Sequence, residues 1–222
     1  MAERIRVMLV DDHRMFTEAL TLLLSLEHGI EVVGSVETAE KALESCSQGI
    51  DVVLMDLNLP GMDGLSAIQA IHAKAPETKV VVVTASAQPE WIARAMQAGA
   101  CGYVLKTKAP QELVQIITRA AAGEIVISPI DMVPILATIG RSGSVRSGVD
   151  MAIEELTARE IEILQLLAEG KPTAEVAHVL SISPLTVQTH VKSVLAKLSV
   201  HSKLEAVAYA LRHRIVQIPQ SA

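Results

Sequence analysis

Aromatic residues are almost absent from this chain. Its 222 residues include one Trp, one Phe and two Tyr, so aromatic side chains make up 2% of the sequence. The core must therefore consist of Val, Leu, Ile, Ala and Met side chains. Half of the residues are hydrophobic, which is typical of a globular protein and argues against a disordered chain. A chain of this length forms one large domain or two small ones.

Cysteine is rare too, and long hydrophobic runs are missing. Cys46 and Cys101 have neither the spacing of metal ligands nor that of a disulfide framework, so we interpret both as reduced structural residues. No hydrophobic run approaches the roughly 20 residues of a membrane span. The charged N-terminus also lacks the layout of a signal peptide. These features predict a cytoplasmic protein that does not use a membrane.

The net charge of −6 argues at first against nucleic acid as a partner. The charge is unevenly distributed, however. Residues 1–123 contain 10 Lys and Arg against 15 Asp and Glu, whereas residues 171–222 contain 6 against 2. An acidic front and a basic tail within one chain indicate two separate functions.

The first 123 residues alternate between short β-branched runs and helix-like stretches. We predict strands at Ile5–Val10, Glu31–Val36, Asp51–Met55, Lys79–Thr84 and Cys101–Leu105. We predict helices at Met15–Leu26, Ala39–Cys46, Leu65–Ala73, Glu90–Ala98 and Gln111–Ala122. Neighbouring parallel strands need crossover helices, so this alternation predicts a doubly wound five-stranded parallel sheet. Ligands of such sheets bind beyond the carboxyl ends of the strands.

Polar side chains follow four of the predicted strands at that edge. They are Asp11 and Asp12, then Asp56, Thr84 and Lys106. A single acid at a strand end is most often a cap or a solvated loop residue. Three carboxylates together repel one another unless a cation joins them, and oxygen ligands favour Mg²⁺ or Mn²⁺. Such a site suits phosphoryl transfer, with Asp56 as the nucleophile and with Thr84 and Lys106 contacting the phosphoryl oxygens.

Four short segments carry a family resemblance. "VMLVDDH", "VVLMDLNLPGMDG", "VVVVTAS" and "GYVLKT" resemble the receiver domain of bacterial two-component response regulators, over about residues 4–122. The resemblance implies an α/β receiver domain with a flavodoxin-like sheet. It also implies that Asp56 accepts a phosphoryl group from the phosphohistidine of a sensor histidine kinase. The ligands of Mg²⁺ would then be Asp11, Asp12, Asp56 and the carbonyl group of Asn58.

The same resemblance implies a switch. Thr84 would move toward the new phosphate, Tyr103 would rotate inward on the fifth strand, and Lys106 would hold the phosphate. From its residue type alone, Tyr103 equally suits a strand aromatic half-packed against the sheet. Thr107 departs from the family's usual Lys-Pro pair. We interpret His13 as the start of the first helix rather than a metal ligand, because Mg²⁺ prefers oxygen.

Residues 124–153 differ in composition from the segments on either side. Ser128 and Pro129 predict the start of a short helix that runs to Ile139. The following "GRSGSVRSGVD" (140–150) is small, polar and aperiodic, as flexible connectors are. We therefore predict one domain over residues 1–123, a linker over 124–153 and a second domain over 154–222.

The second domain is predicted to be an all-α four-helix unit. Its expected helices are Ala158–Glu169, about Ala174–Leu180, a third that begins at Pro184, and Lys203–Arg214. Thr157 and Glu160 fit a capping box for the first helix. Thr173 is a candidate N-cap for the second helix and Ser183 for the third. Two short helices joined by a tight turn form the helix-turn-helix arrangement.

Hydrophobic residues of the third helix repeat with helical spacing and predict one buried stripe. The stripe consists of Val187, Val191, Val194, Leu195 and Leu198. The opposite face contains Leu185, Gln188, Thr189, Lys192, Ser193 and Ala196. Its Gln, Lys and Thr side chains suit the major groove of DNA. Candidates for phosphate contacts are Lys171, Thr173, Ser183, Lys197 and Lys203. A helical dimerisation bundle with an ordinary polar face fits the pattern equally well.

A long segment of this domain decides between those two readings. "LTAREIEILQLLAEGKPTAEVAHVLSISPLTVQTHVKSVLAKLSV" resembles the LuxR/NarL-type helix-turn-helix, over about residues 154–215. A receiver followed by this domain is similar to the NarL/FixJ class of transcription regulators, which are not enzymes. The resemblance adds Thr186 to the candidates for DNA contact. Leu185 stands where the family often has Arg, and Gln188 stands where Lys is common.

Activation is expected to pair two chains. In this family the last helix commonly pairs two DNA domains, and its hydrophobic stripe here consists of Leu204, Val207, Ala208 and Leu211. Core packing explains the first two equally well. Our hypothesis is that phosphorylation of Asp56 shifts the population towards a homodimer that binds paired half-sites of double-stranded DNA. Two alternatives remain: a phosphorelay protein whose C-terminal helices bind protein, and an atypical regulator controlled by a ligand or partner without phosphorylation.

Overall fold

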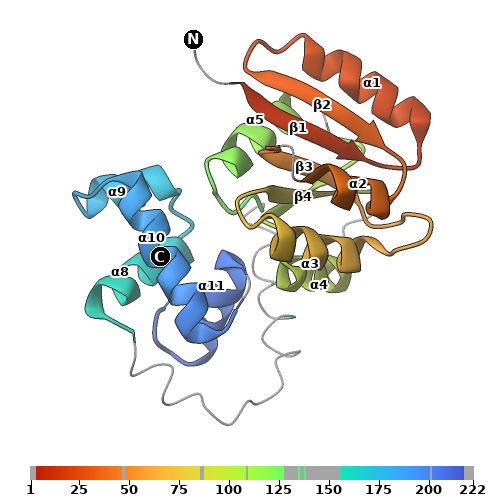
Figure 1. Cartoon of the computed structure of the whole chain (residues 1–222). Helices are drawn as coiled ribbons and strands as arrows, with labels where there is room; N and C mark the ends of the chain where they lie inside the picture. The colour runs from red at the N-terminus through yellow and green to blue at the C-terminus, as the bar shows by residue number, and fades with distance from the viewer. Residues whose placement is uncertain are drawn as a thin grey trace. The chain divides into compact units, whose positions relative to one another are not determined.

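The computed structural model describes residues 4–46, 49–85, 88–108, 110–127, 135, 138, 156–200 and 202–217. The chain divides into two units between Val126 and Ile127. The first is an α/β unit and the second is helical (Figure 1). Apart from Ile135 and Thr138, the short helix and the connector predicted at 128–150 lie outside the described residues.

The first unit contains a five-stranded parallel sheet, as predicted. The strands are β1 (Ile5–Val10), β2 (Ile30–Val36), β3 (Val52–Asp56), β4 (Lys79–Thr84) and β5 (Gly102–Leu105). Their order in the sheet is β2-β1-β3-β4-β5, so the chain changes direction across the sheet at β1. Side chains just beyond the carboxyl ends of β1 and β3 therefore lie at the switch point where such sheets bind ligands.

Five helices alternate with the strands (Figure 1). They are α1 (Arg14–Ser25), α2 (Ala39–Ser45), α3 (Gly64–Lys74), α4 (Pro89–Ala98) and α5 (Pro110–Ala121). Helix α1 contacts α5, while α3 contacts both α2 and α4, as expected when helices cover both faces of a sheet. The predicted strands and helices of this unit agree with these bounds to within one residue.

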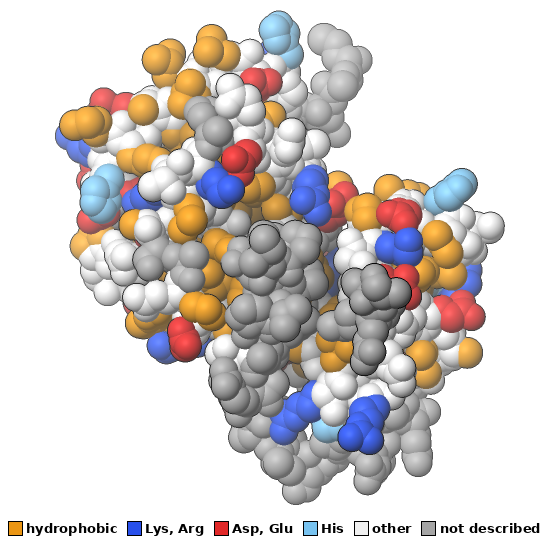
Figure 2. Space-filling view, turned by 180° about the vertical axis from the view of Figure 1, so that it is seen from behind, with side chains coloured by type: hydrophobic (Ala, Val, Ile, Leu, Met, Phe, Trp, Pro, Cys, Tyr) orange, Lys and Arg blue, Asp and Glu red, His pale blue; other side chains and the backbone are white. Residues whose placement is uncertain are grey.

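The core of the first unit is aliphatic, as the composition predicts. All five residues of β3 are buried, and Tyr103 is the only aromatic side chain among the described buried residues. Cys46 is buried, which raises the pKa of its thiol, and neither cysteine forms a disulfide. Helix α1 leaves Met15 and Leu22 exposed, and its C-cap residue Leu26 is also exposed. On the face seen in Figure 2, hydrophobic side chains likewise lie among charged ones.

The second unit contains α8 (Ala158–Ala168), α9 (Thr173–Val179), α10 (Pro184–Leu198) and α11 (Lys203–Arg212). The predicted capping box between Thr157 and Glu160 is present. The turn between α9 and α10 closes through the bond from the Ile182 N–H to the Ala177 carbonyl, at 3.0 Å. Together, α9 and α10 form the predicted helix-turn-helix. None of the described helices is both long enough and apolar enough to cross a membrane.

One predicted cap is wrong. Helix α9 begins at Thr173 itself, and its N-cap residue is Pro172, which makes no side-chain cap. The Thr173 side chain is buried and accepts a hydrogen bond from Lys203 Nζ at 3.2 Å. Its hydroxyl group therefore joins α9 to the start of α11 instead of capping a helix.

Candidate functional sites

Three acids meet at the carboxyl edge of the sheet. Asp11 directly follows β1, Asp12 comes next, and Asp56 is the last residue of β3. Asp11 and Asp56 are 4% and 2% exposed, whereas Asp12 is exposed. One ligand atom from each of these acids and from His13 lies within 4.8 Å of the others. The structure therefore brings the predicted carboxylates together.

Lys106 supplies the counter-charge from the loop after β5. Its Nζ lies 2.6 Å from Asp11 Oδ2 and 2.8 Å from Asp56 Oδ2. Burial lowers the pKa of Lys106, but the hydrogen bonds and charges of Asp11 and Asp56 outweigh it, and the pKa is raised. One ammonium group thus serves a cluster of three acids, and the cluster as a whole keeps an excess of negative charge.

That excess suits a divalent cation. Asp11 Oδ2 is buried, and within the described residues its charge is met by Lys106, which Asp11 shares with Asp56. Carboxylate oxygens are the donors that Mg²⁺ prefers. The residues present therefore fit this ion.

His13 lies beside the cluster and directly precedes α1, as its sequence position predicts. Its Nδ1 lies 3.0 Å from Asp11 Oδ1 and 2.8 Å from Asp12 Oδ1. The side chain is 66% exposed. His13 therefore contacts the exposed side of the acid cluster, whereas Lys106 contacts its buried side.

The other predicted residues of this site lie on β4, β5 and the loop after β3. Thr84 ends β4 and is buried, and the Lys106 N–H donates to its carbonyl at 2.8 Å. Tyr103 on β5 is also buried, with 8% of its surface exposed. Asn58 is exposed, and its backbone N–H donates to Asp56 Oδ1 at 3.2 Å. Asn58 therefore lies next to the acid that the sequence singled out.

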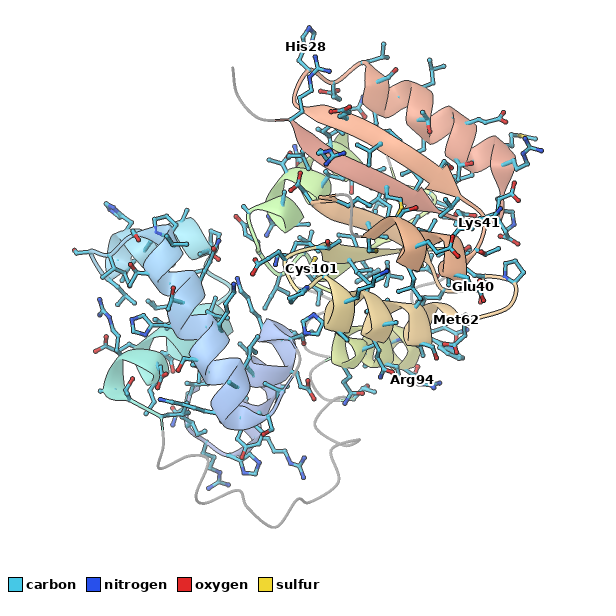
Figure 3. All side chains as sticks on the ribbon, in the orientation of Figure 1. His28, Glu40, Lys41, Met62, Arg94 and Cys101 are labelled. Carbon is cyan, nitrogen blue, oxygen red and sulfur yellow. The ribbon has the colours of Figure 1, made fainter. Side chains whose placement is uncertain are left out.

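Two features constrain the loop between β3 and α3: a close backbone approach at Gly64 and a hydrogen bond from Met62. A Cβ atom at Gly64 would lie 2.6 Å from Leu57 Cα and 2.7 Å from the Asp56 carbonyl oxygen, so this position requires glycine. Glu40 on α2 accepts the Met62 N–H at 3.0 Å, and both residues are labelled in Figure 3. Sequence reasoning missed Glu40, because its partner lies 22 residues away.

The exposed face of α10 contains most of the predicted base contacts. Leu185 is 72% exposed, Thr189 and Lys192 are exposed, and Gln188 is half-buried. The predicted stripe is buried at Val187, Val191, Val194 and Leu198, and half-buried at Leu195. Ser183 caps the helix by accepting the Thr186 N–H at 3.0 Å. The two faces of α10 are therefore arranged as its sequence predicts.

Three predicted DNA contacts are engaged inside the unit. Ser193 Oγ and Lys197 Nζ donate to the buried carboxylate of Glu160, and Thr173 is buried against Lys203. Helical spacing did not reveal these contacts, because the acceptor belongs to a distant helix. Thr173, Ser193 and Lys197 therefore have partners inside the unit, and their contact with DNA stays a prediction. Lys171 forms an ion pair with Glu175 on the surface.

The predicted dimerisation stripe of α11 is largely covered in this structure. Leu204, Val207 and Ala208 are 1%, 1% and 5% exposed. Val207 belongs to the core of the helical unit, and Leu211 packs against that core. Hydrophobic spacing alone does not separate a core stripe from an interface. The pairing of two chains through these residues therefore stays a prediction.

Two residues of α8 tie the helical unit together, and their long-range contacts were missed. Arg159 Nη2 donates to the Leu180 carbonyl at 2.7 Å, which anchors the turn before α10. Glu160 is 2% exposed and binds α10. The sequence showed only the local capping of Glu160, since its partners lie 33 and 37 residues further along.

Comparison with known families agrees with this two-part organisation. Residues 7–118 match the family described as response regulator receiver domain. Residues 154–210 match the family described as bacterial regulatory proteins, luxR family.

Full-length relatives are similar over nearly the whole chain. The nitrate/nitrite response regulator protein NarL of Escherichia coli K12 is 36% identical over 210 residues, covering 94% of this chain and 96% of NarL. The response regulator protein VraR of Staphylococcus aureus is 33% identical over 214 residues, covering 96% and 99%. Among solved structures, the response regulator ChrA of a heme-sensing two-component system has a TM-score of 0.52 at 31% identity, covering 97% of this chain and 100% of ChrA. The chain therefore belongs to the two-component response regulators that combine a receiver domain with a LuxR-type DNA-binding domain.

Proposed function

We propose that Asp56 accepts a phosphoryl group from the phosphohistidine of a sensor histidine kinase. An oxygen of the Asp56 carboxylate forms the new bond to phosphorus as the bond from phosphorus to the histidine nitrogen breaks. The observation that carries this proposal is the position of Asp56 at the end of β3, beside Asp11 and 2.8 Å from Lys106 Nζ. A buried carboxylate at the switch point of a parallel sheet is placed to meet an anionic ligand.

Mg²⁺ would be held by Asp11, Asp12, Asp56 and the carbonyl group of Asn58. When bound, it would neutralise negative charge on the phosphoryl oxygens. Lys106 contacts Asp11 and Asp56, and we expect that its ammonium group would donate to a phosphoryl oxygen on Asp56. Thr84 ends the adjacent strand, and its hydroxyl group would donate to the same phosphoryl group.

The switch that follows would involve Thr84 and Tyr103. Tyr103 lies on β5, and its ring is already buried in this structure. Phosphorylation would increase the population of a state in which this side chain has rotated inward. The altered β5 face would then transmit the signal.

The second unit would bind double-stranded DNA through α10. Leu185, Thr186, Gln188, Thr189 and Lys192 lie on or beside its exposed face, where they would enter the major groove. Ser183 and Lys171, near the N-terminal ends of α10 and α9, would contact phosphates. Since a unit of this size makes few contacts with DNA, paired half-sites and a homodimer would strengthen binding. This function places the protein in the cytoplasm.

The mass of the protein in solution tests this proposal. Light scattering is measured with Mg²⁺, with and without beryllofluoride as a phosphoryl mimic, on the wild type and on Asp56→Asn. We expect a shift from monomer to dimer in the wild type alone. Asp51→Asn is the matched control, because Asp51 lies at the other end of β3 and accepts the Arg6 N–H at 2.7 Å. An equal shift in Asp56→Asn would contradict the proposal.

A further inference from the structure

The carboxylate of Glu160 joins α8 to α10. Its Oε1 accepts Ser193 Oγ at 2.7 Å and Lys197 Nζ at 3.0 Å. Its Oε2 accepts Lys197 Nζ at 2.8 Å and the Thr157 N–H at 2.7 Å. The side chain is only 2% exposed. This buried acid on α8 therefore binds its own helix cap and two side chains of α10.

The two α10 partners lie along one flank of that helix. Ser193 and Lys197 are four residues apart, so they stack on one side of α10. At 3.6 residues per turn, this side lies between the exposed face of Leu185, Thr189 and Lys192 and the buried stripe. Contacts on a flank resist rotation of the helix about its own axis, and that rotation decides which side chains point towards a groove.

The hydrophobic contacts of α10 are less suited to fixing its rotation about the helix axis. Its buried stripe consists of three Val residues and Leu198, and hydrophobic contact has no preferred direction. Hydrogen bonds to a charged carboxylate are directional and short. The hydrogen bonds of Glu160 are thus the contacts best able to set the rotation of α10.

We propose that Glu160 is a positioning residue for DNA recognition, which acts by holding Ser193 and Lys197 and so fixing the face that α10 presents. This inference rests on the proposed DNA-binding function. It assigns Lys197 to the carboxylate of Glu160 and not to a DNA phosphate. If Lys197 left Glu160 to contact DNA, the buried carboxylate of Glu160 would have no cation beside it. This cost opposes a DNA contact by Lys197.

Binding of the full-length protein to two DNA probes tests the proposal. The first probe is a duplex selected from a random pool by the wild type, and the second is the same duplex with its sequence scrambled. The ratio of the two affinities reports recognition, and the dependence of affinity on salt concentration reports phosphate contacts. Both are measured for Lys197→Met and for the double variant Glu160→Gln with Lys197→Met.

We expect the affinity ratio to fall about tenfold in both variants, as for one wrong base pair. The salt slope should not change. The double variant leaves no buried charge, so it remains folded even where Lys197→Met does not. Lys197→Arg keeps a cation for Glu160 and should restore the ratio. Thr157→Ala is the control: it removes the hydroxyl that accepts the Glu160 N–H at 3.2 Å, leaves the bonds to α10, and should not change the ratio.

Two results would overturn the inference and leave DNA binding intact. One is an unchanged affinity ratio in the folded double variant. The other is a salt slope that falls by about 0.9 in Lys197→Met with the ratio retained, which is the effect of losing one phosphate contact. A wild type that enriches no sequence from the pool would instead overturn the proposed DNA-binding function, and this inference with it.

Discussion

Each of the two units contains a buried carboxylate paired with a lysine from a distant part of the chain. Asp56 lies 2.8 Å from Lys106 in the receiver, and Glu160 lies 2.8 Å from Lys197 in the helical unit. The two pairs differ in what surrounds them. Asp56 shares Lys106 with Asp11, and Asp12 is nearby, so negative charge is in excess. Both oxygens of Glu160 accept several hydrogen bonds.

This difference distinguishes a ligand-binding site, around Asp56, from a structural contact, around Glu160. An unbalanced acid cluster costs stability through repulsion, and that cost is lowered when a cation or an anion-cation pair binds. A balanced carboxylate stabilises the fold and has no capacity left for a ligand. Charge balance, rather than burial or the presence of a lysine, distinguishes the two.

The largest expected effect is the loss of the balanced pair. Glu160→Ala should lower the free energy of unfolding of the helical unit by about 3–5 kcal/mol, because the hydrogen bonds that Lys197, Ser193 and Thr157 donate to its charged carboxylate are lost. Urea unfolding followed by far-UV circular dichroism measures this. Trp91 fluorescence reports the receiver separately, since Trp91 is the only Trp in the chain.

Glu162→Ala is the matched control for that variant. Glu162 lies on the same helix and is exposed, and its ion pair with Arg159 lies on the surface. Its removal should cost less than about 1 kcal/mol. If Glu160→Ala and Glu162→Ala lowered the free energy of unfolding equally, the buried pair would contribute no more to stability than the surface pair.

Acid should weaken the helical unit through the same carboxylate. Burial alone would raise the pKa of Glu160, but hydrogen bonds from Lys197, Ser193 and Thr157 lower it from 4.5 to about 2. A lowered pKa stabilises the fold above pH 4.5, and this contribution is lost as the pH falls towards 2. The expected loss is about 3 kcal/mol.

The measurement is the free energy of unfolding of the helical unit between pH 5 and pH 2, for the wild type and Glu160→Gln. The glutamine variant cannot titrate at this position, so its pH dependence should be flatter. An equally steep fall in both proteins would assign the acid sensitivity to other groups.

The smallest expected effect has the opposite sign and lies in the receiver. Asp56→Asn should raise the free energy of unfolding by about 1 kcal/mol without Mg²⁺, because it removes one of three repelling carboxylates. Urea unfolding followed by Trp91 fluorescence measures this. Added Mg²⁺ should stabilise the wild type more than the variant. A clear loss of stability in Asp56→Asn would contradict this prediction. It would mean that the charge of Asp56 is compensated by its neighbours, as the charge of Glu160 is.

Local patterns predicted the fold of both units well. Alternating β-branched and helical segments placed the five strands, and the side chains after β1, β3, β4 and β5 indicated one shared edge. Parallel strands expose their carboxyl ends together, so this site followed from strand order alone. The capping box of Thr157 and the buried stripe of α10 were equally local and are both present.

Long-range polar contacts were beyond such patterns. Glu40 reaches Met62, and Glu160 reaches Ser193 and Lys197, across turns of unpredicted geometry. For the same reason the sequence did not show that Lys197 binds Glu160, or that Leu204, Val207 and Ala208 are buried within one chain. Composition shows that a side chain is charged or hydrophobic. It does not show whether that side chain is already paired with, or packed against, another residue of the same unit.

The amino-acid sequence by itself therefore determined the two-domain architecture, the acid cluster and the exposed face of α10, because helix and strand periodicity and parallel-sheet geometry act locally. Only the tertiary structure decided which charged groups are available to a ligand and which are paired with other groups inside the fold. That division depends on distances between segments 22 to 37 residues apart, which no local rule specifies.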